Sequence, residues 1–159
     1  MKKMYFGIAL IVTLIFSVTA WADQSATKDE CVSKCYEAAA LINSKGVAEA
    51  IKQIGNAKWP FVWKDSYVFL MNLDGKMLVH PMQPELTQLP HCLLITDPTD
   101  KAIFVNFVNT AKNPGHGWIE YMWPRPGKNS PSQKVTYVYR VPGKDLFVAA
   151  GVYVGGMMF

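Results

Sequence analysis

The sequence predicts an α+β fold, in which a five-stranded antiparallel sheet carries a long N-terminal helix on one face and a helix-containing pocket segment on the other. Three observations predict it. A helical pattern of apolar residues follows a capping motif near the start, five later segments are rich in β-forming residues, and short turns join most of these segments. The 159 residues, half of them hydrophobic, are enough for one domain with its own core.

The first predicted element is a helix that starts after a capping box. Thr27 is expected to be the N-cap, and Glu30 lies three residues later, where its side chain can reach back to the N-cap backbone. Apolar residues then recur at helical spacing as far as Ile42, and Gly46 ends the helix. A shorter helical pattern follows over residues 47–54.

After Pro60 the pattern becomes strand-like. Asp74-Gly75 is a typical hairpin turn, and the Pro-rich segment of residues 81–115 links the hairpin to the remaining strands. A helix is expected within this segment, starting near Thr99, because its apolar residues fall on one face. This segment should cover the sheet face opposite the first helix, so that a pocket can form there. Five strands are expected, at residues 67–72, 76–80, 118–123, 134–141 and 146–154.

Residues 1–22 have the pattern of a secretory signal peptide. Lys2 and Lys3 precede an apolar run, and Ala20-Trp21-Ala22 has the small-x-small pattern that a signal peptidase recognises. We expect cleavage after Ala22 and a periplasmic or secreted product of residues 23–159 without stable membrane insertion. The alternative is a leader kept as an anchor, since the apolar run is at the lower limit for spanning a bilayer.

Charge and motif content exclude several classes of function. Without Lys2 and Lys3, 14 basic residues remain against 12 acidic ones, which is no basis for nucleic-acid binding. The sequence contains no Gly-rich phosphate-binding loop, no His-Glu-x-x-His and no Gly-x-Ser-x-Gly. Its Cys and His residues lack a recognised metal-ligand spacing. We therefore expect no enzyme activity, no cofactor and no metal.

The pairing of Cys31, Cys35 and Cys92 stays open. An intact helix resists a Cys31–Cys35 disulfide, because residues four apart hold their Cβ atoms about 5–6 Å apart. A link from either of these cysteines to Cys92 is compatible with the sequence, as are three buried thiols.

The candidate binding site centres on the strand around Tyr121. Strand alternation places Tyr121 and Trp123 on one face, and Arg125 follows if the chain stays extended through Pro124. Two aromatic rings and a guanidinium suit a small carboxylate, because Arg donates two parallel hydrogen bonds to it.

Two further residues are expected at this site. His80 ends a strand that faces the prospective pocket, and Tyr137 is included on the assumption that its strand neighbours that of Tyr121. Lys134, at the start of a predicted strand, is expected to be solvated. The predicted ligand-binding residues are thus Tyr121, Trp123, Arg125, His80 and Tyr137.

The string Trp-x-x-Tyr-x-Trp-Pro-x-Pro-Gly at residues 118–127 is the most specific motif of the chain. With Asp65-Ser66-Tyr67-Val68-Phe69, His80-Pro81 and residues 134–138, it resembles the extracytoplasmic Cache sensor domains of the single-Cache, type 2 kind. The resemblance covers essentially all of residues 23–159. It implies a PAS-like fold with a long leading helix and the binding of small ligands, often short organic acids, outside the inner membrane.

We therefore expect reversible, non-catalytic binding of an acid such as acetate, propionate, lactate or pyruvate. The ligand state could be presented to a membrane receptor or kinase. Receptors of this kind continue into a second membrane helix, whereas this sequence stops at Phe159, so it resembles a stand-alone member. The apolar segment of residues 87–99 also departs from the polar pocket wall expected of the family.

Two alternatives come from other classes of protein. One is a structural or protein-interaction module that kept the fold but lost the pocket. The other is a redox protein that uses Cys31 or Cys35, which would require a lowered thiol pKa.

Overall fold

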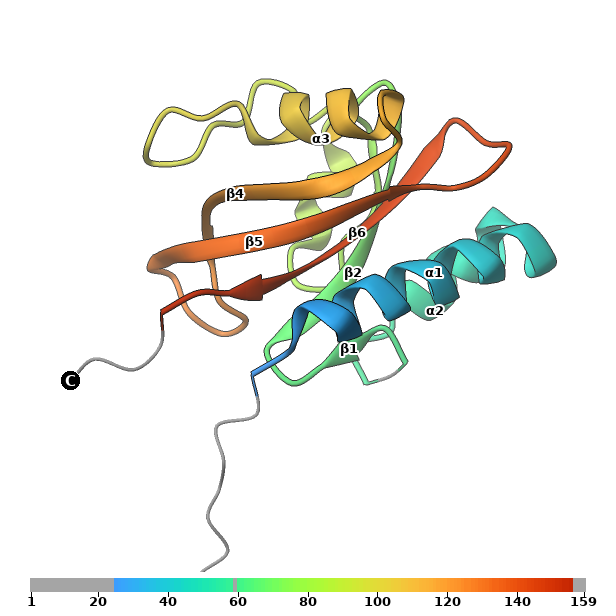
Figure 1. Cartoon of the computed structure of the whole chain (residues 1–159), viewed down its shortest axis with the longest axis horizontal. Helices are drawn as coiled ribbons and strands as arrows, with labels where there is room; N and C mark the ends of the chain where they lie inside the picture. The colour runs from blue at the N-terminus through green and yellow to red at the C-terminus, as the bar shows by residue number, and fades with distance from the viewer. Residues whose placement is uncertain (1–24, 59, 156–159) are drawn as a thin grey trace, which may run out of the picture.

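The structure is a computed structural model that describes residues 25–58 and 60–155 (Figure 1). The predicted signal peptide and its cleavage site after Ala22 lie outside the described residues. No helix within the described ranges is both long and apolar enough to cross a membrane.

Two helices open the domain, α1 (Lys28–Lys45) and α2 (Val47–Ile54). The capping box is confirmed: the Glu30 amide donates to Thr27 Oγ1 at 3.2 Å, and the Thr27 amide donates to Glu30 Oε2 at 2.8 Å. Gly46 separates the helices with φ +84°, a conformation that favours glycine. One face of α1 is buried against the sheet through Cys31, Cys35, Ala38, Ala39 and Ile42.

The sheet is antiparallel throughout, with the strand order β1-β2-β6-β5-β4 and β3 paired to β2. The five predicted strands are confirmed. The additional strand β1 has two residues, too few to show an alternating pattern. β1 and β3 pair with opposite ends of β2. The strands are β1 (Val62–Trp63), β2 (Ser66–Asn72), β3 (Met77–Val79), β4 (His116–Pro124), β5 (Pro131–Arg140) and β6 (Leu146–Tyr153).

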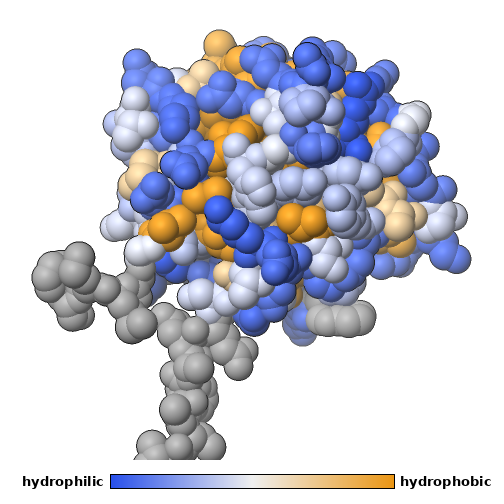
Figure 2. Space-filling model, in the orientation of Figure 1, coloured by the Kyte–Doolittle hydropathy of each residue, from blue (hydrophilic) through white to orange (hydrophobic). Residues whose placement is uncertain are grey.

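Each face of the sheet has its own core. Helices α1 and α2 cover one face, as predicted, whereas α3 (Ile103–Lys112) and the short 3₁₀ helix η1 (Pro84–Gln88) belong to the segment that covers the other (Figure 1). On the surface, apolar side chains show between polar ones (Figure 2). Among the described residues, the exposed large hydrophobic ones are Tyr36, Leu89, Leu94, Trp118 and Val154.

The side chain of Asp97 ties the covering segment to the edge strand β4. Its Oδ1 accepts the amides of Thr99 and Lys101, and its Oδ2 accepts the amide of Met122 at 2.8 Å. Burial alone would raise the pKa of Asp97, but these hydrogen bonds lower it to about 2. Because they hold residues 97–101 as a turn, α3 begins at Ile103 rather than near Thr99.

All three cysteines are buried and free. Burial raises the pKa of the Cys31 thiol to about 11 and raises that of Cys35 as well. The redox interpretation required the opposite shift, because only a thiolate is a good nucleophile.

We expect the substitution Asp97→Ala to lower the free energy of unfolding by about 1–3 kcal/mol, because three partly buried backbone hydrogen bonds lose their common acceptor. Urea denaturation would measure the change. Asp145→Ala is the matched control, since the Asp145 side chain is 88% exposed and takes part in one surface ion pair, to Arg140. Equal effects of the two substitutions would contradict this role of Asp97.

Candidate functional site

A cleft of about 380 Å³ opens beside the carboxyl end of β4. Tyr67 and Trp123 line it at the sheet. Met82, Gln83 and Glu85, after β3, form one wall, and the β4–β5 loop, residues 124–129, forms the other. The cleft is therefore built by the segments that carry the Trp-Pro-x-Pro-Gly part of the motif and the residues after His80-Pro81.

Lys134 is completely buried, and its amine contacts the ring of Tyr67, which lines the cleft. Lys134 is opposite Tyr121 on β4 and Tyr153 on β6, so the three side chains share the α3 face of the sheet. The prediction that Lys134 is solvated is wrong, because β5 begins at Pro131 and Lys134 lies well inside the strand.

The Lys134 amine has no hydrogen-bond partner among the described residues. Its Nζ lies 3.9 Å from the ring centroid of Tyr67 and 4.9 Å from that of Tyr153. Burial lowers the pKa of Lys134 to about 7, although the nearby Cys31 and Asp65 oppose the shift. Contacts with the ring faces offset part of the cost of burying a cation but do not replace an anion.

His80 is also buried, and it packs against Tyr67 and Trp123, which line the cleft. Burial lowers the pKa of its imidazole to about 3, and the charge of Lys134 acts in the same direction. Its Nδ1 accepts the amide of Gln83 at 2.9 Å. The neutral ring therefore carries its proton on Nε2, which is a hydrogen-bond donor. The imidazole centroid lies 4.9 Å from that of Tyr67 and 6.3 Å from that of Trp123.

Tyr121 and Trp123 share the α3 face of the sheet, with ring centroids 6.0 Å apart. The hydroxyl of Tyr121 lies 3.0 Å from Thr136 Oγ1. Tyr121 thus packs behind Trp123, and the structure brings Tyr121, Trp123 and His80 to one site.

Arg125 lines the cleft, but its charge is already paired. Its Nη1 lies 3.0 Å from Asp65 Oδ2, and its Nη2 donates to the carbonyl of Gly155 at 3.4 Å. The guanidinium carbon also lies 4.8 Å from the Tyr153 ring centroid.

Tyr137 is not brought to the cleft. Its strand does neighbour β4, as assumed, but Tyr137 is opposite Trp118, whereas Tyr121 is opposite Lys134. Since 134 and 137 differ by an odd number, the two side chains leave opposite faces of the sheet. Tyr137 packs in the core beneath α1, with its ring 5.2 Å from that of Trp118.

Lys134, Tyr67 and Tyr153 are residues of the candidate site that the sequence interpretation did not assign to it. The sequence contained one indication of this: alternation within residues 134–138 puts Lys134 and Tyr137 on opposite faces, so both could not belong to one site. When the Lys134 amine is protonated, the local charge around Lys134, Arg125 and Asp65 is two positive and one negative. One further negative charge would balance it.

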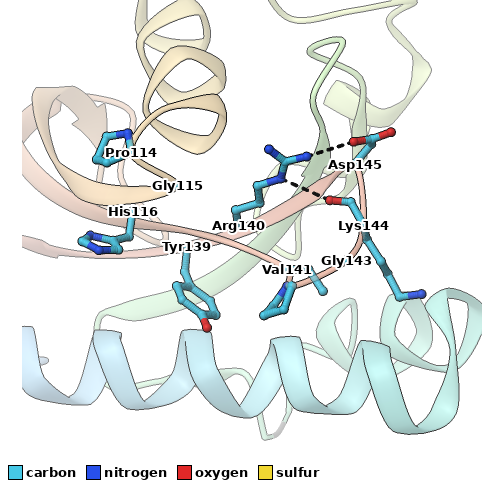
Figure 3. Close-up of a pocket in the computed structure, with 10 residues that line it drawn as sticks. Pro114, Gly115, His116, Tyr139, Arg140, Val141, Gly143, Lys144 and Asp145 are labelled. Atoms are coloured by element: carbon cyan, nitrogen blue, oxygen red, sulfur yellow. Dashed lines mark hydrogen bonds and ion pairs between the residues drawn. The ribbon is translucent and has the colours of Figure 1, made fainter.

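A second hollow of about 410 Å³ lies at the other end of the sheet, between Pro114 and the β5–β6 hairpin (Figure 3). The guanidinium of Arg140, which lines this hollow, donates hydrogen bonds to the carbonyl of Lys144 and to the carboxylate of Asp145 (Figure 3). This hollow therefore lacks the unpaired buried cation that distinguishes the cleft beside Lys134. No group of three or more His, Cys, Asp or Glu side chains placed to hold a metal ion occurs in the part of the chain that the structure describes.

Comparison with protein families finds one matching model, described as a Cache domain (dCache_2), over residues 31–157. Two curated proteins are similar over 90 residues, which is 57% of this chain. The methyl-accepting chemotaxis protein McpP of Pseudomonas putida is 32% identical, and the sensor histidine kinase MctS of Rhizobium johnstonii is 31% identical. The matched region spans only 16% and 19% of the length of these relatives.

Solved structures share the fold. One, described as "Structural basis for carboxylic acid recognition by a Cache chemosensory domain", has a TM-score of 0.65 and 25% identity, and the match covers 80% of this chain and 88% of that one. A methyl-accepting chemotaxis protein from Vibrio parahaemolyticus has a TM-score of 0.66 at 18% identity, with 79% and 87% covered.

We expect Lys134→Met to raise the free energy of unfolding at pH 7 by about 2–4 kcal/mol, because it removes a buried, unpaired amine and keeps the side-chain volume. The lowered pKa means that the unfolded chain binds more protons than the folded one between about pH 7 and 10.5. Wild-type stability should therefore rise with pH across this window, and the Met variant should lack this rise.

Denaturation at several pH values would measure both effects. The exposed Lys112→Met is the control and should change stability by less than about 0.5 kcal/mol. A loss of stability in Lys134→Met would show that the amine supports the fold.

Proposed function

Because the chain belongs to the Cache domain family, we propose that it is a sensor-type domain that binds a short organic acid reversibly and without catalysis. The acid belongs to the class of acetate, propionate, lactate and pyruvate. Its carboxylate binds beside Lys134, between the cleft and the sheet.

The observation that carries this proposal is the buried Lys134 amine without a hydrogen-bond partner among the described residues. A carboxylate supplies the missing counter-charge and accepts a charge-assisted hydrogen bond from Nζ. The Nε2 proton of His80 is a second donor in the same neighbourhood. Hydrogen bonds to charged groups contribute about 1.5–3 kcal/mol each, so two of them with apolar contacts support binding in the micromolar to millimolar range.

Charge and space favour a small monocarboxylate. The group formed by Lys134, Arg125 and Asp65 carries one net positive charge, which a single carboxylate neutralises and a dicarboxylate would overcompensate. The rings of Tyr67 and Trp123 can contact a short aliphatic chain. Because Lys134 is sealed from solvent, one of these aromatic side chains must turn aside for the ligand to enter.

The comparisons support the wider setting. Cache domains are extracytoplasmic sensor domains, and one solved relative is described by its recognition of carboxylic acids. The curated relatives are a chemoreceptor and a sensor kinase. We therefore propose a periplasmic or secreted domain of residues 23–159, released by cleavage after Ala22, whose ligand state is read by a membrane receptor or kinase.

A thermal-shift panel tests the ligand class. Acetate, propionate, lactate and pyruvate should raise the melting temperature of the wild-type protein by several degrees at millimolar concentration, because they bind only the native state. The neutral analogues acetamide and propionamide should not. Lys134→Met should lose the response while remaining folded, and Lys112→Met should keep it.

Two outcomes would contradict the proposal. If none of the acids raised the melting temperature of the folded wild-type protein, the result would favour the alternative of a protein-interaction module that lost its pocket. An unchanged thermal shift with the acids in Lys134→Met would show that Lys134 does not bind the ligand.

Binding should also weaken as the pH rises. Burial keeps the free-site pKa of Lys134 near 7, so the ammonium is lost above that pH while the ligand stays anionic. Of the other groups near the amine, His80 remains neutral, and burial raises the pKa values of Cys31, Tyr67, Tyr121 and Tyr153.

We therefore expect affinity to fall by about twofold from pH 6 to 7 and by up to about tenfold per pH unit above that. Calorimetry in buffers of different ionisation enthalpy would show uptake of a proton on binding at pH 8. Affinity that is independent of pH up to 9 would contradict an ammonium anchor.

A further inference from the structure

Asp65 joins three segments that are far apart in the sequence. Its Oδ1 accepts the amide of Ala26, just before α1, at 2.8 Å. Its Oδ2 pairs with Arg125, in the loop that lines the cleft, and Arg125 in turn donates to the carbonyl of Gly155, just after β6. The entrance to α1 and the exit from β6 lie on the same side of the molecule (Figure 1).

The turn that carries Asp65 is held in an unfavourable conformation. Lys64 and Asp65 form the two-residue connection between β1 and β2, and Lys64 has φ +48°, where glycine or asparagine is favoured. The Lys64 ammonium lies 2.6 Å from Glu30, the residue that closes the capping box of α1. Both turn residues thus bind the start of α1 through their side chains.

A continuous set of contacts leads from the ligand site to this turn. The Tyr153 ring contacts both Lys134 Nζ, at 4.9 Å, and the Arg125 guanidinium, at 4.8 Å. The Tyr153 hydroxyl donates to the carbonyl of Pro124 at 2.6 Å, which fixes the start of the loop that carries Arg125. Arg125 then contacts Asp65.

A change of charge at Lys134 would alter the interactions of Asp65. Without ligand, the carboxylate of Asp65 interacts with two cations, Arg125 at 3.0 Å and the more distant Lys134, whose pKa it influences. A bound carboxylate would neutralise Lys134. Asp65 would then interact with Arg125 alone, and the ligand would also fill the space under the loop.

We propose that the Asp65–Arg125 ion pair couples carboxylate binding to the two ends of the domain, so that ligand binding fixes the entrance to α1 and the exit from β6 together. The ligand is that of the proposed function, whereas the junction itself is independent of the ligand's identity.

Hydrogen–deuterium exchange on the full chain at pH 6, with saturating sodium propionate as the probe, tests this coupling. In wild type, amides at residues 26–30 and 153–155 should exchange about two- to fivefold more slowly with propionate, which is the effect of stabilising one partly exposed ion pair. Asp65→Asn keeps an oxygen for the Ala26 amide but loses the charge. With propionate at a concentration that saturates this variant, as its own thermal-shift titration would establish, neither end should show ligand-dependent protection.

Asp145→Asn is the matched control, because it removes an ion pair with Arg140 at the other end of the sheet, and its response should equal that of wild type. Without ligand, Asp65→Asn should speed exchange at both ends, whereas faster exchange at residues 26–30 alone would overturn the junction. Propionate binding without protection of the ends in wild type would overturn the coupling and leave the proposed function intact. Absence of any thermal shift would overturn the proposed function.

Discussion

The organisation of the site depends on one amine that the fold removes from water without giving it an anion. Lys134 lies in the middle of the sheet, between the rings of Tyr67 and Tyr153, and neighbouring groups on the α3 face remain neutral around it. A buried cation of this kind opposes folding, and the proposed carboxylate ligand would supply the counter-charge that the described residues do not. The neutral His80, the aromatic side chains and the paired Arg125 are all arranged around that one unbalanced charge.

The architecture explains how the amine is held there. Helices α1 and α2 close one face of the sheet, and the segment with η1 and α3 closes the other, so that residues on the α3 face lose contact with water. The β4–β5 hairpin sets Lys134 opposite Tyr121, and the loop of that hairpin brings Arg125 to Asp65. The same few residues therefore define the cleft and join it to the start of α1 and the end of β6.

Local patterns were sufficient to predict the longer helices and strands, and long-range contacts determined the site. The capping box at Thr27 and the face shared by Tyr121 and Trp123 depend on residues a few positions apart, and both were predicted correctly. The face of Tyr137 depends on the register between β4 and β5, and alternation within one strand does not fix that register. The partner of Arg125 is 60 residues away along the chain, a contact that no local pattern encodes. The prediction that Lys134 is solvated was wrong for a related reason, because it placed the start of β5 three residues late.

The bonds between residues 97–101 and β4 also bear on how the molecule meets other molecules. β4 is an outer strand, and unpaired backbone groups on such a strand are a template for the addition of a foreign strand. The amide of Met122 is occupied by Asp97, and the carbonyl of Glu120 accepts the Lys101 ammonium. An incoming peptide would have to displace both bonds to extend the sheet there. The segment that covers the α3 face thus also protects the domain against aggregation through strand addition along this part of its edge.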